Sequence, residues 1–462
     1  MTVAAGHRRT LPLTRTPRTP RTPRTPRTPR TPRTPAERLR TVPTAPATER
    51  ALLIGIDHDT PDATWTVGDS LAELAQLAAT AGAEVLGAMY QRLREPVSAT
   101  YLGKGKLVEV RDRLAALDAD TVIADDELSP AQQRHLEEAL DARVLDRTAL
   151  ILDIFARHAR THEGALQVEL AQLEYRLPRL AGRGEGYSRL GAGIGTRGPG
   201  ETKLESDRRR IRGRIAELRR ALEEVRRQRS VQRRWRGRQG VPVVAIVGYT
   251  NAGKSTLLNR LTEAGALAED KLFATLDPTT RTLALPHRQQ ALITDTVGFI
   301  QKLPTDLVAA FKATLEEVSE ADLLLHVVDI SSPHALAQAL TVYGILAQLG
   351  AEDKRVVTAL NKSELVDEDT VADYLDDFPN PVAVSAARGL NLDLLRERIA
   401  GVLAADFRPV EVVLPYEAKD LLDLFHLRGA IDDEDYRPDG AHIRGRVPPD
   451  VTGAFRAYRV ES

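Results

Sequence analysis

One segment restricts the fold of this chain more than any other: an apolar run that leads directly into a glycine-rich loop. The run Val243–Gly248 has the composition of a buried strand, and the loop Gly248–Ser255 reads Gly-Tyr-Thr-Asn-Ala-Gly-Lys-Ser before a helical pattern starts at Thr256. In this strand–loop–helix context, the motif wraps backbone amides around a β-phosphate at a helix N-terminus. The segment therefore predicts a P-loop nucleotide-binding fold. A glycine turn before a surface helix would leave the downstream motifs unexplained.

Side chains in this loop and beyond it predict a metal-assisted switch. Lys254 is expected to reach the β- and γ-phosphates, and the hydroxyl of Ser255 to bind Mg²⁺. Thr275 follows the first helix, where its hydroxyl can join the ion when a γ-phosphate is present. Asp295 ends an apolar run and can hold Mg²⁺ through water, while the amide of Gly298 can sense the γ-phosphate. These motifs predict Mg²⁺ as the cofactor.

Two later motifs predict that the base is guanine. Asn361 follows an apolar strand pattern, and together with Glu364 it would read the guanine edge while the stem of Lys362 lies across the base. Ser385 follows another apolar run, and Ser385-Ala386 can offer a backbone amide to the base carbonyl. No residue is assigned a catalytic role. The predicted GTP site, with Ser255 and Thr275 as Mg²⁺ ligands, comprises Gly248, Tyr249, Thr250, Asn251, Ala252, Gly253, Lys254, Ser255, Phe273, Ala274, Thr275, Leu276, Asp277, Asp295, Thr296, Val297, Gly298, Asn361, Lys362, Ser363, Glu364, Ser385, Ala386 and Ala387.

Two positions depart from the usual guanine-nucleotide switch. The acid that reads the base is usually aspartate, and here it is Glu364, whose extra methylene costs entropy while still allowing paired acceptance of the base N–H groups. The residue after Gly298 is Phe299, where Ras-like switches place a glutamine that orients the attacking water. An apolar ring cannot do this. We therefore expect slow intrinsic hydrolysis that needs a partner, a moving loop or another ordered water.

Three further parts of the chain have distinct patterns. Seven Arg-Thr-Pro triplets between Arg15 and Pro35 predict a polyproline-like disordered tail, either a non-specific nucleic-acid arm or a solvated repeat without a specific role. Alternating strand and helix patterns from Ala51 predict a small parallel α/β domain. Within it, Gly103–Lys106 is either a phosphate-binding turn or a plain glycine turn with solvated lysines. The segment Glu411–Ser462 predicts a small α+β appendage.

Two helical patterns before the P-loop predict an antiparallel hairpin. The apolar stripes in Leu166–Leu177 and Leu204–Val225 are each too narrow for an independent core, so the two helices should pair. The segment Asp207–Arg238 holds 14 arginines against 4 acids. The connection Gly182–Gly200 has eight glycines among nineteen residues, far more than a tight hairpin needs. A basic, glycine-rich loop suits close approach to a phosphate backbone better than it suits an idle linker.

The expected architecture is α/β: a P-loop GTPase domain preceded by a small parallel α/β domain and an antiparallel helical hairpin, and followed by a small α+β domain. The expected boundaries are 1–49 for the tail, 50–160 for the N-terminal α/β domain, 161–240 for the hairpin, 241–405 for the GTP-binding domain and 406–462 for the C-terminal domain. The absence of cysteine excludes disulfides and thiolate metal sites. No apolar run approaches the roughly 20 residues that span a bilayer. We expect a cytoplasmic monomer, free, ribosome-bound or peripherally associated with a membrane.

Taken together, the motifs resemble those of the HflX-type GTPases over about residues 51–405. The resemblance rests on Tyr101–Lys106, Leu128–Arg134, Gly193–Thr202, Gly248–Ser255, Phe273–Asp277 and Asp295–Phe299. It implies a GTPase that binds the large ribosomal subunit and its rRNA, splits or rescues stalled ribosomes under stress, and hydrolyses GTP faster on the ribosome. It also implies that the loop Gly182–Gly200 reaches rRNA near the peptidyl-transferase centre. In this family, an ATP-dependent RNA-unwinding activity is associated with the N-terminal domain.

Two other functions stay open from the sequence alone. One is a nucleotide-regulated RNA-binding scaffold in which hydrolysis is incidental. The other is a metabolic ATPase or kinase, which Asn361-Lys362 and the lack of a second catalytic constellation disfavour.

Overall fold

The computed structural model describes residues 48–58, 65–180, 199–262, 272–273, 279–304 and 317–460, without the side chains of 199–204 and 230–239. The Arg-Thr-Pro tail, the loop segment 182–198 and Thr275 lie outside the described residues, as do Ala274, Leu276 and Asp277. Among the helices that the structure describes, none is long and apolar enough to cross a membrane.

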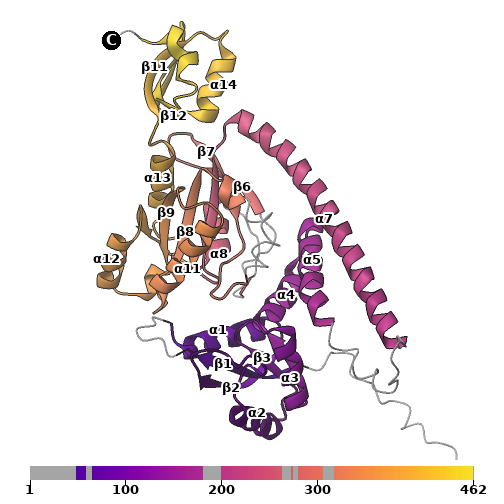
Figure 1. The fold of residues 1–462 in the computed structure, drawn as a ribbon. Coiled ribbons are helices and arrows are strands. Elements are labelled where there is room, and N and C mark those ends of the chain that lie inside the picture. Colours follow the sequence, from indigo (N-terminus) through magenta and orange to yellow (C-terminus); the bar gives the residue numbers. More distant parts are fainter. Residues whose placement is uncertain are drawn as a thin grey trace, which may run out of the picture. The chain divides into compact units, whose positions relative to one another are not determined.

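The N-terminal region, residues 50–158, is built on a four-stranded parallel sheet of order β2-β1-β3-β4 (Figure 1). The inner positions of β1 are buried on both faces, as expected for a central parallel strand. Leu53 packs toward α1 and α4, whereas Leu52 packs toward α2 and α3. The elements are β1 (Arg50–Asp57), α1 (Val67–Thr80), β2 (Glu84–Arg92), α2 (Lys104–Leu117), β3 (Thr121–Ala124), α3 (Pro130–Leu140), β4 (Arg143–Asp146) and α4 (Arg147–His158).

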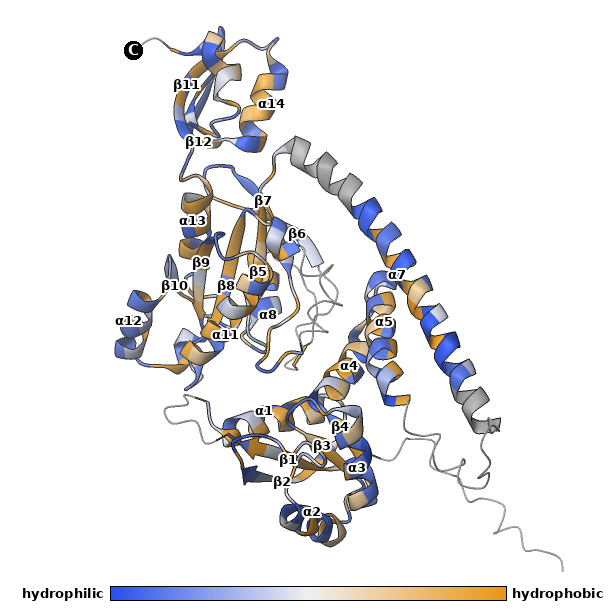
Figure 2. Cartoon of the chain, viewed as in Figure 1, coloured by the Kyte–Doolittle hydropathy of each residue, from blue (hydrophilic) through white to orange (hydrophobic). Residues whose placement is uncertain are grey.

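Two long helices, α5 (His162–Arg179) and α7 (Pro199–Gln239), form the predicted hairpin, in which α7 runs back along α5 (Figure 1). Leu166 and Leu170 pack against Ile215, Leu218 and Leu222 in an apolar seam of their own. Outside this seam the described part of α7 is hydrophilic (Figure 2). The narrow stripe therefore serves the pairing of the two helices and leaves the rest of α7 polar.

The P-loop region, residues 243–403, contains a six-stranded sheet of order β10-β9-β8-β5-β7-β6. All neighbouring strands are parallel except β6, which pairs antiparallel with β7. Because parallel strands end at one edge, the segments after β5, β8 and β9 meet there, where α/β proteins bind ligands. The elements are β5 (Val243–Gly248), α8 (Lys254–Leu261), β6 (Thr279–Ala284), β7 (Gln290–Asp295), β8 (Leu323–Asp329), α11 (Ala335–Gln348), β9 (Arg355–Asn361), η3 (Ser363–Leu365), α12 (Glu368–Asp377), β10 (Pro381–Ala383) and α13 (Leu392–Leu403).

The C-terminal region, residues 408–458, is an antiparallel sheet of order β11-β13-β12 with α14 packed on it, which agrees with the predicted α+β appendage. Phe425 and Phe455 meet edge to face in its core, with ring centroids 5.2 Å apart. The amide of Ile431 donates to the carbonyl of His287, in the turn between β6 and β7, at 2.9 Å. The elements are β11 (Arg408–Leu414), α14 (Lys419–Arg428), β12 (Ala430–Arg437), β13 (Gly440–Val447) and η4 (Thr452–Tyr458).

Candidate nucleotide-binding site

The loop between β5 and α8 requires glycine at two positions. Gly248 has φ of 154°, and a Cβ atom there would lie 2.4 Å from the carbonyl oxygen of Val327. Gly253 has φ of 95°, and a Cβ atom there would lie 2.3 Å from Nδ2 of Asn361. Because L-residues rarely adopt these φ values and no room exists for a methyl group, both motif glycines are fixed by the backbone path.

Asn361, at the end of β9, joins two of the predicted motifs to the phosphate loop. Its side-chain amide donates to the carbonyl oxygen of Ala252 at 2.8 Å, and its Oδ1 accepts a hydrogen bond from the amide of Ala386 at 2.9 Å. The asparagine is 2 % exposed. The structure therefore brings together the phosphate loop, the strand end at Asn361 and the Ser385-Ala386 motif, whose Ala386 amide is engaged in orienting Asn361.

The predicted metal and phosphate groups converge beside this loop. The hydroxyl of Ser255 donates to Oδ2 of Asp295 at 2.6 Å. Nζ of Lys254 donates to the carbonyl oxygen of Tyr249 at 2.7 Å. Burial lowers the pKa of Lys254 to about 8, against the opposing effect of the Asp295 carboxylate, which raises it. A buried, desolvated ammonium gains strongly from an added anion, so the donor set fits a phosphate group together with a hard cation.

Two of the predicted site residues have a buried polar atom without a hydrogen-bond partner among the described residues. These atoms are Oγ1 of Thr250, in the phosphate loop, and Oε2 of Glu364, in η3 after β9. A buried polar atom without a hydrogen bond is costly, and a ligand that supplies the missing partner removes the cost. The unpaired oxygen of Glu364 fits the predicted acceptance of guanine N–H groups.

Asp329, at the end of β8, belongs to the site but was not singled out from the sequence. Its Oδ2 accepts a hydrogen bond from Nζ of Lys362 at 2.6 Å, and β-pairing sets Asp329 directly beside Asn361. The lysine predicted to lie across the base is thus held by a carboxylate on the neighbouring strand. An acid that ends an apolar run, as Asp295 does, is the sequence signal that marks this position.

The segment after Asp295 is fastened to the phosphate loop by backbone hydrogen bonds. The amide of Phe299 donates to the carbonyl of Gly248 at 3.1 Å, and the amide of Thr250 donates to the carbonyl of Phe299 at 2.8 Å. A Cβ atom on Gly298 would lie 3.0 Å from Nζ of Lys254. The amide predicted to sense the γ-phosphate therefore stands next to the lysine predicted to bind it.

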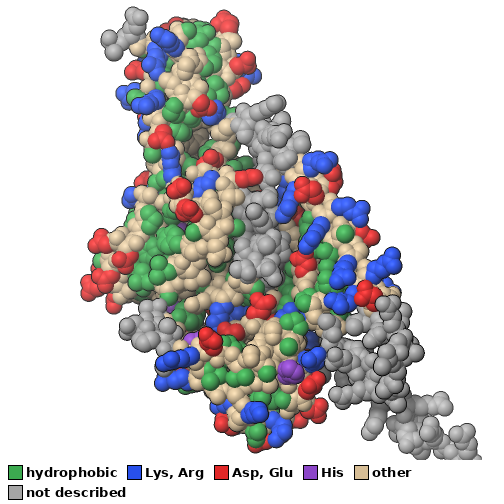
Figure 3. All heavy atoms as spheres, viewed as in Figure 1, with side chains coloured by type: hydrophobic (Ala, Val, Ile, Leu, Met, Phe, Trp, Pro, Cys, Tyr) green, Lys and Arg blue, Asp and Glu red, His purple; other side chains and the backbone are tan. Residues whose placement is uncertain are grey.

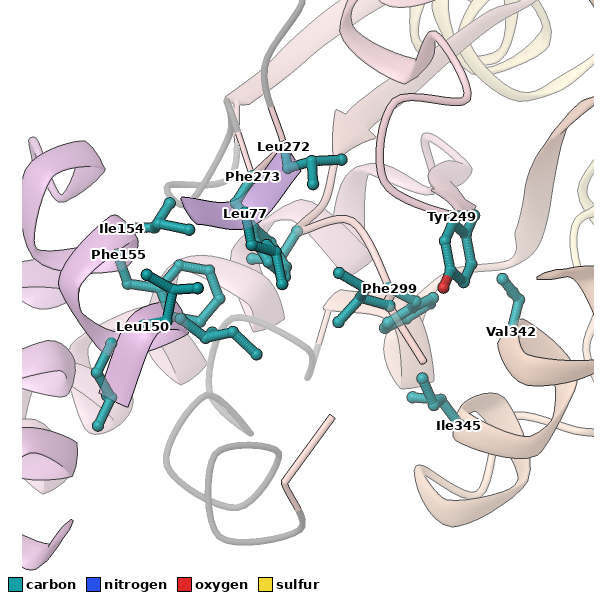
Figure 4. Close-up of a cluster of buried hydrophobic side chains, with 14 of the residues drawn as sticks. Leu77, Leu150, Ile154, Phe155, Tyr249, Leu272, Phe273, Phe299, Val342 and Ile345 are labelled. Atoms are coloured by element: carbon teal, nitrogen blue, oxygen red, sulfur yellow. The ribbon is translucent and has the colours of Figure 1, made fainter. Parts of the chain in front are cut away.

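The aromatic residues of the two switch motifs are buried. Phe299 is 1 % exposed and Phe273 is 2 % exposed. Phe273 packs edge to face on Phe155 of α4, with ring centroids 4.7 Å apart (Figure 4). Leu77 of α1 lies in the same cluster. The apolar ring of Phe299 has no group that could orient a water molecule, and it lies in the cluster that joins the P-loop region to the N-terminal region.

Comparison with known proteins matches three family models in succession. They are described as GTP-binding GTPase N-terminal (residues 68–156), GTP-binding GTPase Middle Region (158–236) and 50S ribosome-binding GTPase (243–362). The GTPase HflX of Lacrimispora saccharolytica is 50% identical over 405 residues, covering 87% of this chain and 94% of that protein. The GTPase HflX of Escherichia coli is 41% identical over 409 residues, again covering 87% and 94%.

The chain belongs to the HflX family of GTPases. As an HflX-family member it is a GTP hydrolase, and its GTPase region matches the 50S ribosome-binding type. The resemblance inferred from the sequence motifs is thereby confirmed, as is the α/β fold class. A solved GTP-binding protein of Sulfolobus solfataricus in complex with GDP aligns with a TM-score of 0.40 at 24% identity, covering 78% of this chain and 99% of that one.

Proposed function

We propose that this HflX-family GTPase docks on the large ribosomal subunit through its helical hairpin, and that docking stimulates GTP hydrolysis. In this proposal it acts in the cytoplasm as a monomer that splits or rescues stalled ribosomes under stress. Two features support it: the match to a 50S ribosome-binding GTPase model and the basic surface of α7 in the same chain as the nucleotide site.

The charge of α7 is the observation that carries the proposal. Basic side chains follow the helix in the space-filling view (Figure 3). Arg214 and Arg219 are paired with Glu169 and Glu174 of α5, each at 2.7 Å. Exposed arginines such as Arg209, in contrast, have no carboxylate partner among the described residues. Arginines that are not already neutralised suit RNA phosphates, because each contact releases counterions.

Further exposed arginines extend this surface along α7. Arg212 and Arg220 are exposed, and the open space above Gly213 leaves the backbone between them accessible. The rise of an α-helix is about 1.5 Å per residue, so Arg209 and Arg220 are roughly 16 Å apart along the axis. We propose that this face follows an rRNA backbone while the loop Gly182–Gly200 reaches further into the subunit.

The nucleotide chemistry follows from the same proposal. GTP or GDP would bind at the predicted site residues, and Ser255 and Thr275 would hold Mg²⁺, with Asp295 acting through water. The ion would neutralise phosphate charge, while Lys254 binds the β- and γ-phosphates. The boundaries expected from the sequence, at residues 50, 161, 241 and 406, are proposed to separate the functional parts.

A co-sedimentation experiment with large subunits across a salt series tests the docking surface. The variant Arg209→Gln/Arg212→Gln should bind more weakly and reduce the slope of log affinity against log salt by about 1 to 2. The variant Arg214→Gln/Arg219→Gln removes the same charge from arginines already paired with α5, and it should keep most of the slope. Equal effects of the two variants would contradict docking through this face.

One observation favours a second candidate, a nucleotide-regulated RNA-binding scaffold. Phe299 supplies no polar side chain for hydrolysis, so nucleotide occupancy rather than turnover would be the signal in a scaffold. Turnover that large subunits leave unchanged, in a chain that still binds them, would favour this alternative.

A further inference from the structure

Tyr249 belongs to the phosphate loop, but its side chain packs against the N-terminal region. Phosphate binding uses the loop amides, which any residue supplies, yet the phenol here is 5 % exposed. Its hydroxyl accepts a hydrogen bond from the amide of Gln301 at 2.8 Å and donates one to Oε2 of Glu73. The side chain therefore connects three segments: the phosphate loop, the chain after Phe299, and helix α1 of the N-terminal region.

Arg147, the first residue of α4, binds the same two residues, Gln301 and Glu73. Its Nη1 donates to the carbonyl oxygen of Gln301 at 3.0 Å and to Oε1 of Glu73 at 2.7 Å. Its Nη2 donates to Oδ1 of Asp125 at 2.7 Å. The guanidinium is 1 % exposed. The amide and the carbonyl of Gln301 are therefore fixed by Tyr249 and Arg147, both of which bind Glu73.

Lys302, the residue after Gln301, is held by two ion pairs. Nζ of Lys302 pairs with Asp125 and Asp126, at 2.5 and 2.7 Å. Burial and the Glu73 carboxylate raise the pKa of Tyr249 well above its usual value, so the phenol keeps its proton and acts as a donor. A buried ionic network of this kind is costly unless each group is paired, and here Glu73, Asp125 and Arg147 are all paired.

We propose that Tyr249 is a positioning residue for GTP hydrolysis, acting through the backbone of the segment Gly298–Gln301. Phe299 cannot orient water, so the backbone groups of this segment have to stand at the correct place beside the phosphate loop. Hydrolysis is sensitive to misplacement of the groups around the attacking water. Tyr249 fixes the end of the segment to the loop that holds the phosphates, and Glu73 and Arg147 extend the support into the N-terminal region.

This inference rests on the GTPase activity of the family and not on the proposed ribosomal role. Glu73 and Arg147 lie more than 100 residues before the switch in the sequence. In this proposal both support the hydrolytic site. The apolar cluster around Phe299, Phe273 and Phe155 holds the two regions together at the same place (Figure 4). We therefore expect that nucleotide binding, by ordering the switch segment, also affects the contacts that the N-terminal region makes with it.

The test is single-turnover GTP hydrolysis by full-length Tyr249→Phe, which removes one hydroxyl and keeps the loop amides. The rate constant should fall about tenfold, the value of one well-placed hydrogen bond, while GDP affinity changes less than about twofold. Tyr175→Phe is the matched control, because its hydroxyl also donates to a buried carboxylate, that of Asp146 at 2.8 Å, away from the phosphate loop. The control should hydrolyse GTP at the wild-type rate.

Three outcomes would overturn the inference. An unchanged or faster rate in Tyr249→Phe would show that the hydroxyl does not position the switch. A parallel loss of GDP affinity would indicate damage to the loop rather than to hydrolysis. An equal fall in Tyr175→Phe would indicate a general loss of stability. Glu73→Gln keeps an acceptor for Tyr249, and its rate should lie between those of the wild type and Tyr249→Phe.

Discussion

The side-chain amide of Asn361 lies 2.8 Å from the carbonyl oxygen of Ala252 and donates a hydrogen bond to it. The strand that carries the base-reading residues is therefore fastened to the phosphate loop. A change that displaces either partner is expected to affect both halves of the nucleotide site.

Gly253→Ala is the sharpest such change. A methyl group there would press on Nδ2 of Asn361, and the residue would be forced to keep a left-handed φ of 95°. The strain is worth about 1–3 kcal/mol, so GDP should bind about ten- to a hundredfold more weakly in calorimetry. Gly105→Ala, which meets nothing within 4 Å, is the control. Unchanged affinity in Gly253→Ala would contradict the contact.

Lys254 predicts a pH dependence of nucleotide binding. Its pKa is about 8 without nucleotide, and adjacent phosphates should raise it. Below pH 8 the lysine is protonated in both states, so affinity stays constant with respect to this group. Above pH 8 binding has to take up a proton, and affinity should fall by up to about tenfold per pH unit. Calorimetry at pH 9 in buffers of different ionisation enthalpy measures the uptake, and its absence would refute the assignment.

Lys254→Ala should abolish GTP binding, because it removes the main cation that faces the β- and γ-phosphates. The fold should persist, since the ammonium contacts only the Tyr249 carbonyl in the hydrogen bonds described. Circular dichroism checks the fold and calorimetry checks the affinity. Wild-type affinity in a folded variant would remove this loop from the site.

Glu364 predicts how the base is read. Its Oε2 is buried and has no hydrogen-bond partner in the part of the chain that the structure describes, which suits acceptance of a guanine N–H group. Glu364→Asp should keep or improve GDP affinity, whereas Glu364→Ala should lose about 2 kcal/mol or more. If all three proteins bind GDP equally, another residue reads the base.

Because Phe299 cannot orient water, we expect the isolated protein to hydrolyse GTP slowly. The Phe299 ring is buried in the cluster with Phe273 and Phe155, so Phe299→Gln would place an amide among apolar side chains. The variant should melt at a lower temperature without hydrolysing GTP faster. A several-fold faster free-protein rate would show that a glutamine at this position is all that the site lacks.

Local signals mark the ends of some elements. The apolar run Thr121–Ala124 forms strand β3, and helix α3 (Pro130–Leu140) starts where Ser129 and Gln132 form a capping box. Helix α2 starts at Lys104. Its N-cap, Gly103, has no side chain to mark the start, and its amide is bonded to Gln91, which favours the plain turn over a phosphate site.

The nucleotide motifs could be predicted from the sequence because each is a short run of residues at the end of a strand. The pairing of Tyr249 with Glu73 was not, since the two lie 176 residues apart and neither belongs to a recognisable pattern with the other. The pairing of Lys362 with Asp329 depends on strand register between β8 and β9. Such contacts follow from packing, which local sequence does not encode.

Ribosome-stimulated hydrolysis is tested most directly by GTP turnover with and without large ribosomal subunits, compared between the intact chain and a variant lacking Gly184–Gly198. The intact chain should turn over slowly alone and at least about tenfold faster with subunits. The deletion variant should bind GTP normally, because the nucleotide contacts follow Val247, and should lose the stimulation. Subunits that stimulate the deletion variant as strongly as the intact chain, or that stimulate neither, would contradict docking of the hairpin as the trigger of hydrolysis.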